Sequence, residues 1–455
     1  MEGVGAALRA LEWVAHELAL LAATGFVILG LGDIVVDLIW LARSLVRRKL
    51  PTLTVARLPP PLDDGPLVIF TPAWDESAVI GRMLAHTLAT LSHRDYRIYV
   101  GCYPNDPATI AVVEAVAGPR IRIVIGPVPG PTTKADCLNR LWRAMQADEV
   151  REGRRFKAVV LHDAEDVVHP DELTVLGTMV DRHDLVQLPV VAMIHPKSPF
   201  VSGSYADEFS ESHGKEMVVR GAIGAALPSA GVGCAFSRRA LVAIAGAENL
   251  PFDAASLTED YELGLKLRDL GATAAFVRVR DAEGRLVSTR EYFPHRFRDA
   301  VHQKSRWMTG IALAGWDRLG WSGRLAERWM RLRDRQSLLA AFLLFCGYLS
   351  LILWASLKLA GLGVDWQSVE VGSMLVLALE LNLVLLAWRV AMRFGFVTHL
   401  YGWRQGLLSI PRILTGNFIA ICAAFKALVR YRTIVKGGRA EWGKTAHDFP
   451  VSVDA

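Results

Sequence analysis

The acidic tetrapeptide DAED at residues 163–166 places three carboxylates within four residues. Their mutual repulsion is costly unless a cation or a helix N-terminus offsets it, and hard oxygen donors suit Mg or Mn bound to a diphosphate. Asp163 and Glu165 are therefore the candidate metal ligands. The alternative is a solvated acidic turn that leads into the next helix.

A second acidic segment, Thr258-Glu259-Asp260, has the composition of a helix start, with Thr258 at the N-cap and carboxylates in the first turn. We expect this helix to run to about Leu270. One interpretation is capping chemistry alone. In the other, Asp260 is a general base that the helix N-terminus keeps ionised, so its strength comes from position rather than from a strongly raised pKa.

A third segment, QKSRW at 303–307, places Gln303, Arg306 and Trp307 at spacings that bring them to one side of a helix. Arginine can grip a diphosphate through two parallel hydrogen bonds, and tryptophan offers a flat face on which a sugar ring stacks. The alternative for Trp307 is an aromatic anchor at a membrane interface.

The elements that must position these motifs lie between about residues 60 and 335, where short apolar runs alternate with helical patterns. This alternation predicts an α/β domain with an open sheet, whose ligands bind at the carboxyl ends of the strands. DAED directly follows one such run. The expected strands are 67–71, 97–102, 121–125 and 158–161, with an amphipathic helix at 77–91.

Composition indicates a chain that is part membrane and part soluble, because 52% of the residues are hydrophobic and 21% are charged. The five cysteines lack metal-binding spacing, which favours reduced thiols and a cytosol-facing body. The net charge of +5 is small, and the basic residues cluster beside apolar segments. They indicate membrane topology, and we expect no nucleic-acid partner.

The apolar segments predict a membrane helix at about 18–42 within residues 1–50, and two more at about 337–357 and 371–388 within 336–392. Basic residues after the first segment should hold the following chain in the cytosol. Residues 393–435 have positive charge on both sides of their apolar stretch, so we expect interfacial or re-entrant helices there. Residues 436–455 then form a cytosolic tail.

Asp33 and Asp37 share one face of the first segment. Carboxylates inside a membrane usually face a bundle or a wet cavity, and these two could contact a translocating polymer. The alternative is that they lie near a helix end or pair with a neighbouring polar group. The same two interpretations apply to Glu380.

In order along the chain, these motifs resemble those of the family 2 glycosyltransferases, over roughly residues 65–435. Within the processive membrane synthases of that family, the chain looks most like the phage-adsorption protein B type of bacterial inner-membrane transferases. The runs that carry this likeness are YPNDPAT at 103–109, VVHP after DAED, and WGKTAHDFP at 442–450.

The resemblance implies a glycosyltransferase A-type, Rossmann-like domain and assigns further residues to its site. The PAxNE pattern appears as Pro72, Ala73, Trp74, Asp75 and Glu76, and the KxxxLN element as Lys134, Leu138 and Asn139. The usual acidic pair after the second strand is missing. The implied donor-binding residues are Pro72, Ala73, Asp75, Glu76, Asn105, Asp106, Lys134, Asp163 and Arg306. The implied acceptor-binding residues are Gly231, Gly233, Gln303 and Trp307, and the implied catalytic residues are Asp260, Glu259 and Arg306.

The implied reaction is inverting transfer of a hexose or N-acetylhexosamine from a UDP-sugar, with Mg or Mn, to a growing exopolysaccharide that is exported as it grows. The resemblance further implies a multi-pass protein of the bacterial inner membrane with a cytosolic catalytic domain. It also implies an export partner in the periplasm or outer membrane and a cyclic-di-GMP-binding regulator. In related synthases a gating loop closes over the donor, and the resemblance makes Trp442, Lys444, Thr445 and His447 its expected counterpart. The alternatives are single-sugar transfer to a polyprenyl phosphate carrier and a non-catalytic membrane scaffold or phage-receptor component.

Overall fold

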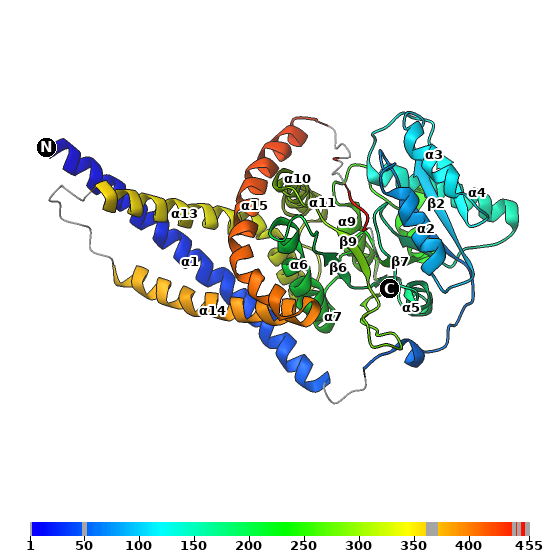
Figure 1. Cartoon of the computed structure of the whole chain (residues 1–455), viewed down its shortest axis with the longest axis horizontal. Coiled ribbons are helices and arrows are strands. Elements are labelled where there is room, and N and C mark those ends of the chain that lie inside the picture. The colour runs from blue at the N-terminus through cyan, green and yellow to red at the C-terminus, as the bar shows by residue number, and fades with distance from the viewer. Residues whose placement is uncertain (1, 48–51, 361–371, 439–442, 444–446, 451–455) are drawn as a thin grey trace.

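The computed structural model describes residues 2–47, 52–360, 372–438, 443 and 447–450. Figure 1 shows long helices extending to one side and a layered α/β part on the other. Of the expected gating segment, Trp442, Lys444 and Thr445 lie outside the described residues.

A seven-stranded mixed sheet organises the α/β part, in the order β3-β2-β1-β4-β7-β5-β8. β7 runs antiparallel to both of its neighbours, and the other adjacent strands are parallel. The strands are β1 (Leu67–Pro72), β2 (Tyr96–Cys102), β3 (Ile121–Ile125), β4 (Ala158–Leu161), β5 (Leu185–Gln187), β7 (Cys234–Ser237) and β8 (Ala274–Phe276). The open α/β sheet and the four expected strands are confirmed, the strands to within one residue.

Helices cover both faces of this sheet, which explains why β1 is apolar and buried along its whole length. Leu67 and Ile69 pack with α2, α3 and α5, whereas Val68 and Phe70 pack with α4, α8 and α9. Each such fully buried side chain contributes about 1.5–3 kcal/mol. The helices are α2 (Ile80–Thr90), α3 (Pro107–Val116), α4 (Lys134–Glu152), α5 (Glu172–Met179), α8 (Arg238–Ala245) and α9 (Glu259–Asp269).

A second layer lies between the sheet and the long helices (Figure 1). It contains the parallel pair β6 (Val190–Met193) and β9 (Thr289–Tyr292) and an aromatic core that includes Tyr205 and Phe293. Its helices are α6 (Val201–Glu211), α7 (Met217–Ile223), α10 (Phe297–Met308), α11 (Gly315–Leu319) and α12 (Leu325–Arg335). Two π-helical segments, Ser212–Glu216 and Thr309–Ala314, interrupt this layer, and short 3-10 turns span Val55–Arg57 and Gly246–Glu248.

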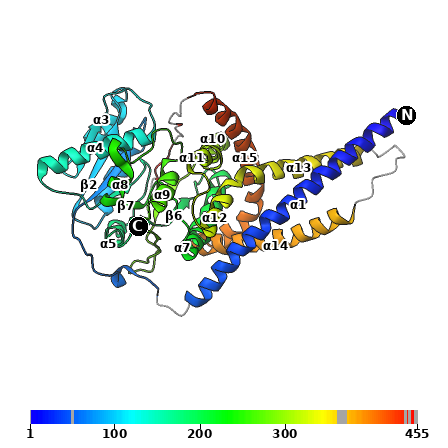
Figure 2. The ribbon, with the colours of Figure 1, turned by 180° about the vertical axis from the view of Figure 1, so that it is seen from behind.

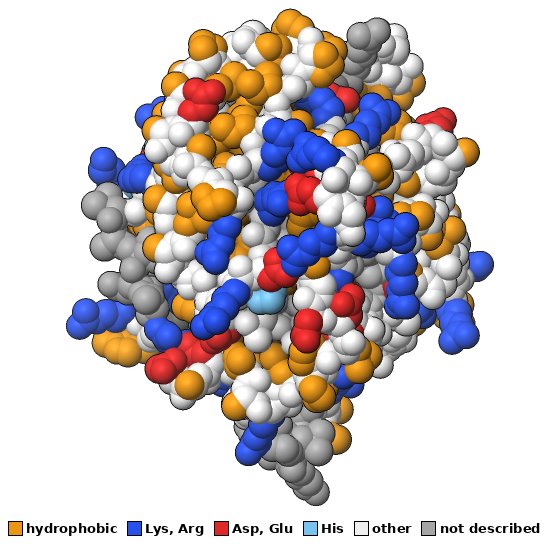
Figure 3. Space-filling view, turned by 90° about the vertical axis from the view of Figure 1, so that its right-hand side faces the viewer, with side chains coloured by type: hydrophobic (Ala, Val, Ile, Leu, Met, Phe, Trp, Pro, Cys, Tyr) orange, Lys and Arg blue, Asp and Glu red, His pale blue; other side chains and the backbone are white. Residues whose placement is uncertain are grey.

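The two parts of the molecule differ in surface chemistry. On the face of the α/β part remote from the long helices, Lys and Arg side chains are interspersed with Asp and Glu (Figure 3). The long helices instead expose large apolar side chains, among them Phe342, Leu351, Leu377 and Leu383. This contrast is the one expected between a water-exposed domain and a membrane-embedded bundle.

Among the described residues, four helices are long and apolar enough to cross a membrane. They are α1 (Glu2–Arg47), α13 (Ser337–Ala360), α14 (Ser373–Tyr401) and α15 (Trp403–Val435). In Figures 1 and 2, α1, α13 and α14 extend away from the sheet, whereas α15 runs across their near ends. The first three contain the expected spans, except that Val371 lies outside the described residues. The interfacial placement of 393–435 stays a prediction.

The two aspartates of α1, Asp33 and Asp37, are paired with cations. Asp33 lies 2.8 Å from Arg333 of α12 and 2.5 Å from Arg389 of α14. Asp37 is buried, lies 2.6 Å from Lys215 and accepts a hydrogen bond from the Trp388 indole at 2.8 Å. These contacts match the interpretation of paired carboxylates near a helix end, rather than groups that contact a translocating polymer.

Candidate active site

The acidic turn after β4 is held by one of its own carboxylates. Asp166 is fully buried and accepts hydrogen bonds from His162 Nδ1 (2.7 Å) and from the backbone N–H of Asp163 (3.1 Å). His162 also lies 2.8 Å from Glu172, and although burial disfavours the charged imidazole, the two carboxylates raise its pKa to about 10. Asp166 is therefore a structural member of DAED, which leaves Asp163 and Glu165 as the candidate metal ligands.

Lys134 connects this turn to the second acidic motif. It is the first residue of α4, and its Nζ lies 2.6 Å from Asp163 Oδ1 with 17% of the side chain exposed. Burial opposes its charged form, but Asp163, Glu259 and Asp260 together raise its pKa above the ordinary value. The structure thus brings three predicted site segments, distant in the sequence, into one electrostatic cluster.

The Thr-Glu-Asp segment begins α9, as predicted, and Thr258 occupies the N-cap position. The hydroxyl of Thr258 makes no capping hydrogen bond; it lies instead beside Gly310. Burial raises the pKa of Asp260, although Lys134 opposes the shift. Burial and the neighbouring Asp260 raise the pKa of Glu259 to about 7. Desolvation thus shifts the pKa of Asp260 upward against the helix N-terminus, and the role of Asp260 as a base that acts through its position stays a prediction.

Two glycines of the segment before β7 make room for the neighbouring side chains. Gly231 has a φ of +80°, and a Cβ atom there would overlap Asp260 Oδ2. Gly233 has a φ of +56°, and a Cβ atom there would overlap the hydroxyl of Thr289. A side chain at either position would meet both backbone strain and a collision. The predicted acceptor segment therefore passes directly over the candidate base.

The QKSRW motif lies on α10, close to the same carboxylates. Arg306 opposes the upward pKa shifts of Glu259 and Asp260, and its Nη1 donates to the Gly443 carbonyl at 3.4 Å. Gln303 is buried, and its side-chain oxygen accepts no hydrogen bond among the described residues. Trp307 is half-buried within an aromatic cluster formed with Tyr205, Phe209 and Phe293.

The expected donor segment follows β1 at the carboxyl edge of the sheet. Pro72 ends β1, and the buried Ala73 donates its N–H to Gly101 of β2 at 2.8 Å. Asp75 adopts a left-handed φ of +54°, and Glu76 is buried. The PAWDE segment thus forms a tight turn beside the predicted nucleotide pocket.

Asn105 and Asp106 hold this turn and its neighbours in place. Asp106 accepts a hydrogen bond from the Asp75 backbone at 2.6 Å and caps α3 through Thr109. Asn105 exchanges two hydrogen bonds with the Gly130 backbone, at 2.8 and 2.7 Å. Both side chains position the loops of the pocket, and direct contact with a nucleotide stays a prediction.

An aromatic pair near these loops was not predicted from the sequence. Trp74 and Tyr103 pack edge to face with ring centroids 5.2 Å apart, and Arg140 lies over the Tyr103 ring at 4.4 Å. A Cβ atom at Gly130 would press against both aromatic rings. The only signal in the sequence is that Tyr103, a bulky residue, stands after β2 where the family usually has an acidic pair.

Glu291 of β9 was also missed. It is 8% exposed, and burial together with Asp166, Glu165 and Asp163 raises its pKa well above the ordinary value. The only sequence signal is an acidic residue in a short strand pattern. Its proximity to DAED depends on a contact between distant segments, which a single sequence does not reveal.

The described part of the C-terminal segment contacts the same region. His447 forms an ion pair with Glu165, and Phe449 is buried against α2. Asp448 lies 3.1 Å from His295 and 3.5 Å from His195. Because the Nδ1 atom of His195 already accepts the Lys197 N–H at 3.2 Å, its Nε2 atom carries the proton. Both histidines therefore lie within ion-pair distance of Asp448 and hold this part of the C-terminal segment against the domain.

The chemistry of Asp163 and Glu165 fits a divalent cation. Both offer hard oxygen atoms, and Glu165 Oε2 is buried without a hydrogen-bond partner among the described residues. Magnesium is usually held by one or two carboxylates together with substrate phosphates. Two carboxylates at the carboxyl edge of the sheet therefore suit a metal that arrives with a diphosphate.

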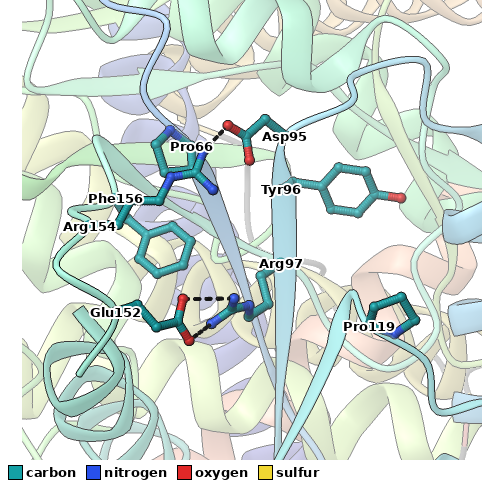
Figure 4. A pocket seen from close by; sticks show the side chains of 8 residues that line it. All are labelled: Pro66, Asp95, Tyr96, Arg97, Pro119, Glu152, Arg154 and Phe156. Atoms are coloured by element: carbon teal, nitrogen blue, oxygen red, sulfur yellow. Dashed lines mark hydrogen bonds and ion pairs between the residues drawn. The ribbon is translucent and has the colours of Figure 1, made fainter. Parts of the chain in front are cut away.

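A shallow depression at the opposite, amino ends of β1 and β2 has no comparable chemistry. It is lined by Asp95, Arg97, Glu152 and Arg154 among others. Figure 4 shows that these charged side chains form ion pairs with one another: Arg97 binds Glu152 at 2.8 and 2.9 Å, and Arg154 binds Asp95. The cluster around Lys134 remains the candidate site.

Known proteins share this architecture. Residues 65–310 match the family described as "Glycosyltransferase like family 2". The chain is 39% identical over 462 residues to bacteriophage adsorption protein B of Escherichia coli strain K12, covering 95% of this chain and 62% of that protein. The same values hold for bacteriophage N4 adsorption protein B of Escherichia coli O157:H7. The chain thus spans less than two thirds of the length of these relatives.

Among solved structures, the chain is similar to the mannosyltransferase PcManGT from Pyrobaculum calidifontis in complex with GDP-Man and Mn2+. The TM-score is 0.52 at 18% identity, covering 92% of this chain and 99% of that chain. At this level of identity the likeness concerns the fold, and the predicted glycosyltransferase A-type architecture is confirmed.

Proposed function

The chain belongs to glycosyltransferase-like family 2, and from this premise we propose that it transfers a sugar, with inversion, from a UDP-sugar to a growing exopolysaccharide. The predicted resemblance to this family and to its phage-adsorption protein B type is confirmed by the family match and by the 39% identity. The enzyme class is therefore that of the glycosyltransferases. Donor, acceptor and the roles of single residues are the content of the proposal.

One observation carries the proposal. Lys134 lies 2.6 Å from Asp163, and Glu259 and Asp260 also raise the pKa of Lys134. The same lysine therefore interacts with the proposed donor-binding motif and with the motif that contains the candidate base. The backbone of Gly231 lies against Asp260 on the remaining side. A sugar between these groups has a cation near its leaving diphosphate and a carboxylate near the attacking hydroxyl.

Each residue then has a role that its surroundings support. Asp260 accepts the proton of the acceptor hydroxyl as that oxygen attacks the anomeric carbon, and the raised pKa brings the base nearer to neutral pH. Arg306 and Lys134 offset the negative charge that develops on the diphosphate. The displacement is direct and inverts the anomeric centre, so it requires no covalent intermediate with the enzyme.

A divalent metal, Mg or Mn, fits this scheme at Asp163 and Glu165, where it would supply Lewis-acid stabilisation of the departing diphosphate. Gln303 and Trp307 are proposed to line the acceptor path together with Gly231 and Gly233. The loops around Asp75 and Asn105 are proposed to form the wall of the nucleotide pocket.

We further propose that α1, α13 and α14 cross the bacterial inner membrane and that the α/β domain faces the cytosol. α15 would lie along the cytosolic interface, because its Arg412 is almost fully buried against α6. There Arg412 lies 3.1 Å from Asp207 and donates to the Pro199 carbonyl at 2.6 Å. A charged residue fixed to the catalytic domain in this way suits a helix that packs on the domain better than one immersed in lipid.

The direct test is release of UDP from a panel of UDP-hexoses and UDP-N-acetylhexosamines by the purified full chain with Mg2+. We expect Asp260→Asn to lower turnover about 100-fold or more while UDP still binds. Asp64→Asn, a change in an exposed loop, serves as the matched control. No nucleotide-sugar turnover by the wild type, or turnover unchanged in Asp260→Asn, would refute the proposal and favour a non-catalytic scaffold.

A second candidate, transfer to a polyprenyl phosphate carrier, is favoured by one observation. Lys426 and Arg430 of α15 lie near His302 of α10, and burial together with these cations lowers the pKa of His302 to about 4. Such a cationic wall suits an acceptor that bears a phosphate. Product sizing separates the two candidates: one sugar per acceptor indicates a carrier, and a ladder of lengths indicates a polymer.

A further inference from the structure

A carboxylate interrupts the apolar outer surface of α14. Glu380 is exposed, and between Ser373 and Trp388 it is the only charged residue of this helix. At about 1.5 Å per residue, Glu380 lies about 10 Å from Ser373, where the helix begins, and about 13 Å from Arg389. It is therefore deep within the apolar part of the proposed membrane bundle, away from both ends of that part.

The side of α14 that carries Glu380 faces away from the other long helices. Figures 1 and 2 show α14 at the edge of the bundle, with α1 between it and α13. The opposite side of α14 packs on α1: Leu375 and Ala378 are buried there, and Asn382 donates to the Ala23 carbonyl at 2.8 Å. Glu380 makes no hydrogen bond or ion pair with any residue that the structure describes.

Lipid chains cannot satisfy a carboxyl group at this depth. The side chains one helical turn away from Glu380, which are Val376, Leu377, Leu383 and Val384, are exposed and have no hydrogen-bonding group. Polar groups buried in a membrane without a partner are costly, and those found there almost always face other protein groups or water. This face of α14 therefore requires a partner that brings a polar group to the same depth.

The spacing of residues along this face indicates that the partner is a helix. Ser373, Glu380 and Ala387 recur every seven residues, and Val376 and Leu383 lie between them with the same period. A heptad pattern of this kind is typical of the seam between two packed helices, and small residues such as Ser and Ala allow membrane helices to approach closely. A surface that contacts only lipid needs no such period.

We propose that this seam, formed by Ser373, Val376, Glu380, Leu383 and Ala387, pairs with the same seam of a second copy of the chain. Two copies insert into the membrane in the same orientation, so their α14 helices are parallel, and equivalent heptad positions face each other at the same depth. A protonated Glu380 in one copy can then donate a hydrogen bond to the carboxylate of Glu380 in the other. The proposal rests on the placement of α14 in the membrane that is proposed above, and it does not depend on the proposed reaction.

The first test measures self-association of the full chain in liposomes, by energy transfer between donor-labelled and acceptor-labelled copies as the protein-to-lipid ratio is varied. We expect Glu380→Leu to weaken association about 5- to 30-fold, as loss of an interhelical hydrogen bond between membrane helices predicts. Glu380→Gln keeps hydrogen-bonding groups and should associate like the wild type. Leu386→Ala is the matched control, because Leu386 is also exposed on α14 but lies about 120° around the helix from Glu380.

The second test locates the seam by disulfide cross-linking in membranes of the expressing cells. Exposed Cys422 is first replaced by serine so that it cannot form cross-links. Ala387→Cys should then yield cross-linked dimers under mild oxidation. Leu386→Cys, which lies at nearly the same depth but outside the seam, should yield far fewer.

Three results would overturn the proposal: a monomeric chain at every protein-to-lipid ratio, equal association of the wild type and Glu380→Leu, or equal cross-linking at positions 386 and 387. Association with a different membrane protein that Glu380→Leu abolishes, in place of self-association, would overturn the choice of a second copy as the partner. Release of UDP is measured in the same liposomes. Self-association without UDP release would refute the proposed function and support the pairing of α14.

Discussion

Replacement of Gly231 by alanine tests the geometry around the candidate base most directly. The backbone at Gly231 has a φ of +80°, where an L-residue costs about 1–2 kcal/mol, and the new methyl group would overlap Asp260 Oδ2. Asp260 must then move by about 1 Å, and a misplacement of this size typically lowers turnover about 100-fold. We therefore expect a large loss of turnover with a modest loss of thermal stability.

Gly224→Ala is the matched control for this experiment. Gly224 also has a left-handed φ, +69°, but a Cβ atom there meets no other atom within 4 Å. It incurs the backbone cost without the collision. Initial rates of UDP release and melting temperatures should be measured for both variants in the same detergent. Equal loss of turnover in the two variants, or near-normal turnover in Gly231→Ala, would refute the placement of Asp260.

Three further predictions concern the site, and a fourth concerns the membrane topology of α15. Burial and Asp260 raise the pKa of Glu259 to about 7. Turnover should therefore rise with pH as the pair of Glu259 and Asp260 loses its proton. Glu259→Gln should move the midpoint of the rate profile to lower pH. Because the folded-state pKa of Glu259 exceeds its ordinary value of 4.5, the folded protein holds that proton more tightly, and thermal stability should decrease as pH rises from about 4.5 through 7 unless Glu259 is replaced. Removal of metal by EDTA should abolish UDP release, and Asp163→Asn should raise the Mg2+ concentration for half-maximal rate about tenfold, whereas Asp171→Asn should not. A reporter that works only in the cytosol should be active when it is fused after residue 438. Activity of a reporter that works only in the periplasm, fused at the same position, would show that α15 crosses the membrane.

Local patterns predicted the sheet and the chemistry at its edge. Ile121–Ile125 and Ala158–Leu161 have the expected bounds because short apolar runs between turn residues specify buried strands. The start of α9 at Glu259 followed equally from capping chemistry. Such features depend on residues close together in the chain, which a single sequence displays fully.

Features that depend on long-range contacts were not accessible in the same way. The position of Glu291 beside DAED requires the β6–β9 pair to lie against the main sheet. No residues near Glu291 in the sequence predict this packing. The upward shift of the Asp260 pKa was not visible in the sequence either, because a helix N-terminus can be read from the residues but desolvation by distant segments cannot. The hydrogen bonds between the Asn105 amide and the backbone of Gly130 were likewise not predictable from the sequence.

The pairing of Asp33 has a consequence for biosynthesis. Its partners, Arg333 and Arg389, follow it by 300 and 356 residues in the chain. At about 5–20 residues per second, the ribosome produces the first of them roughly 15–60 s after α1 has emerged. During that interval Asp33 lacks both of these partners. Both ion pairs of Asp33 can therefore form only after α12 and α14 have been made, so the contact of α1 with these helices is completed late in synthesis.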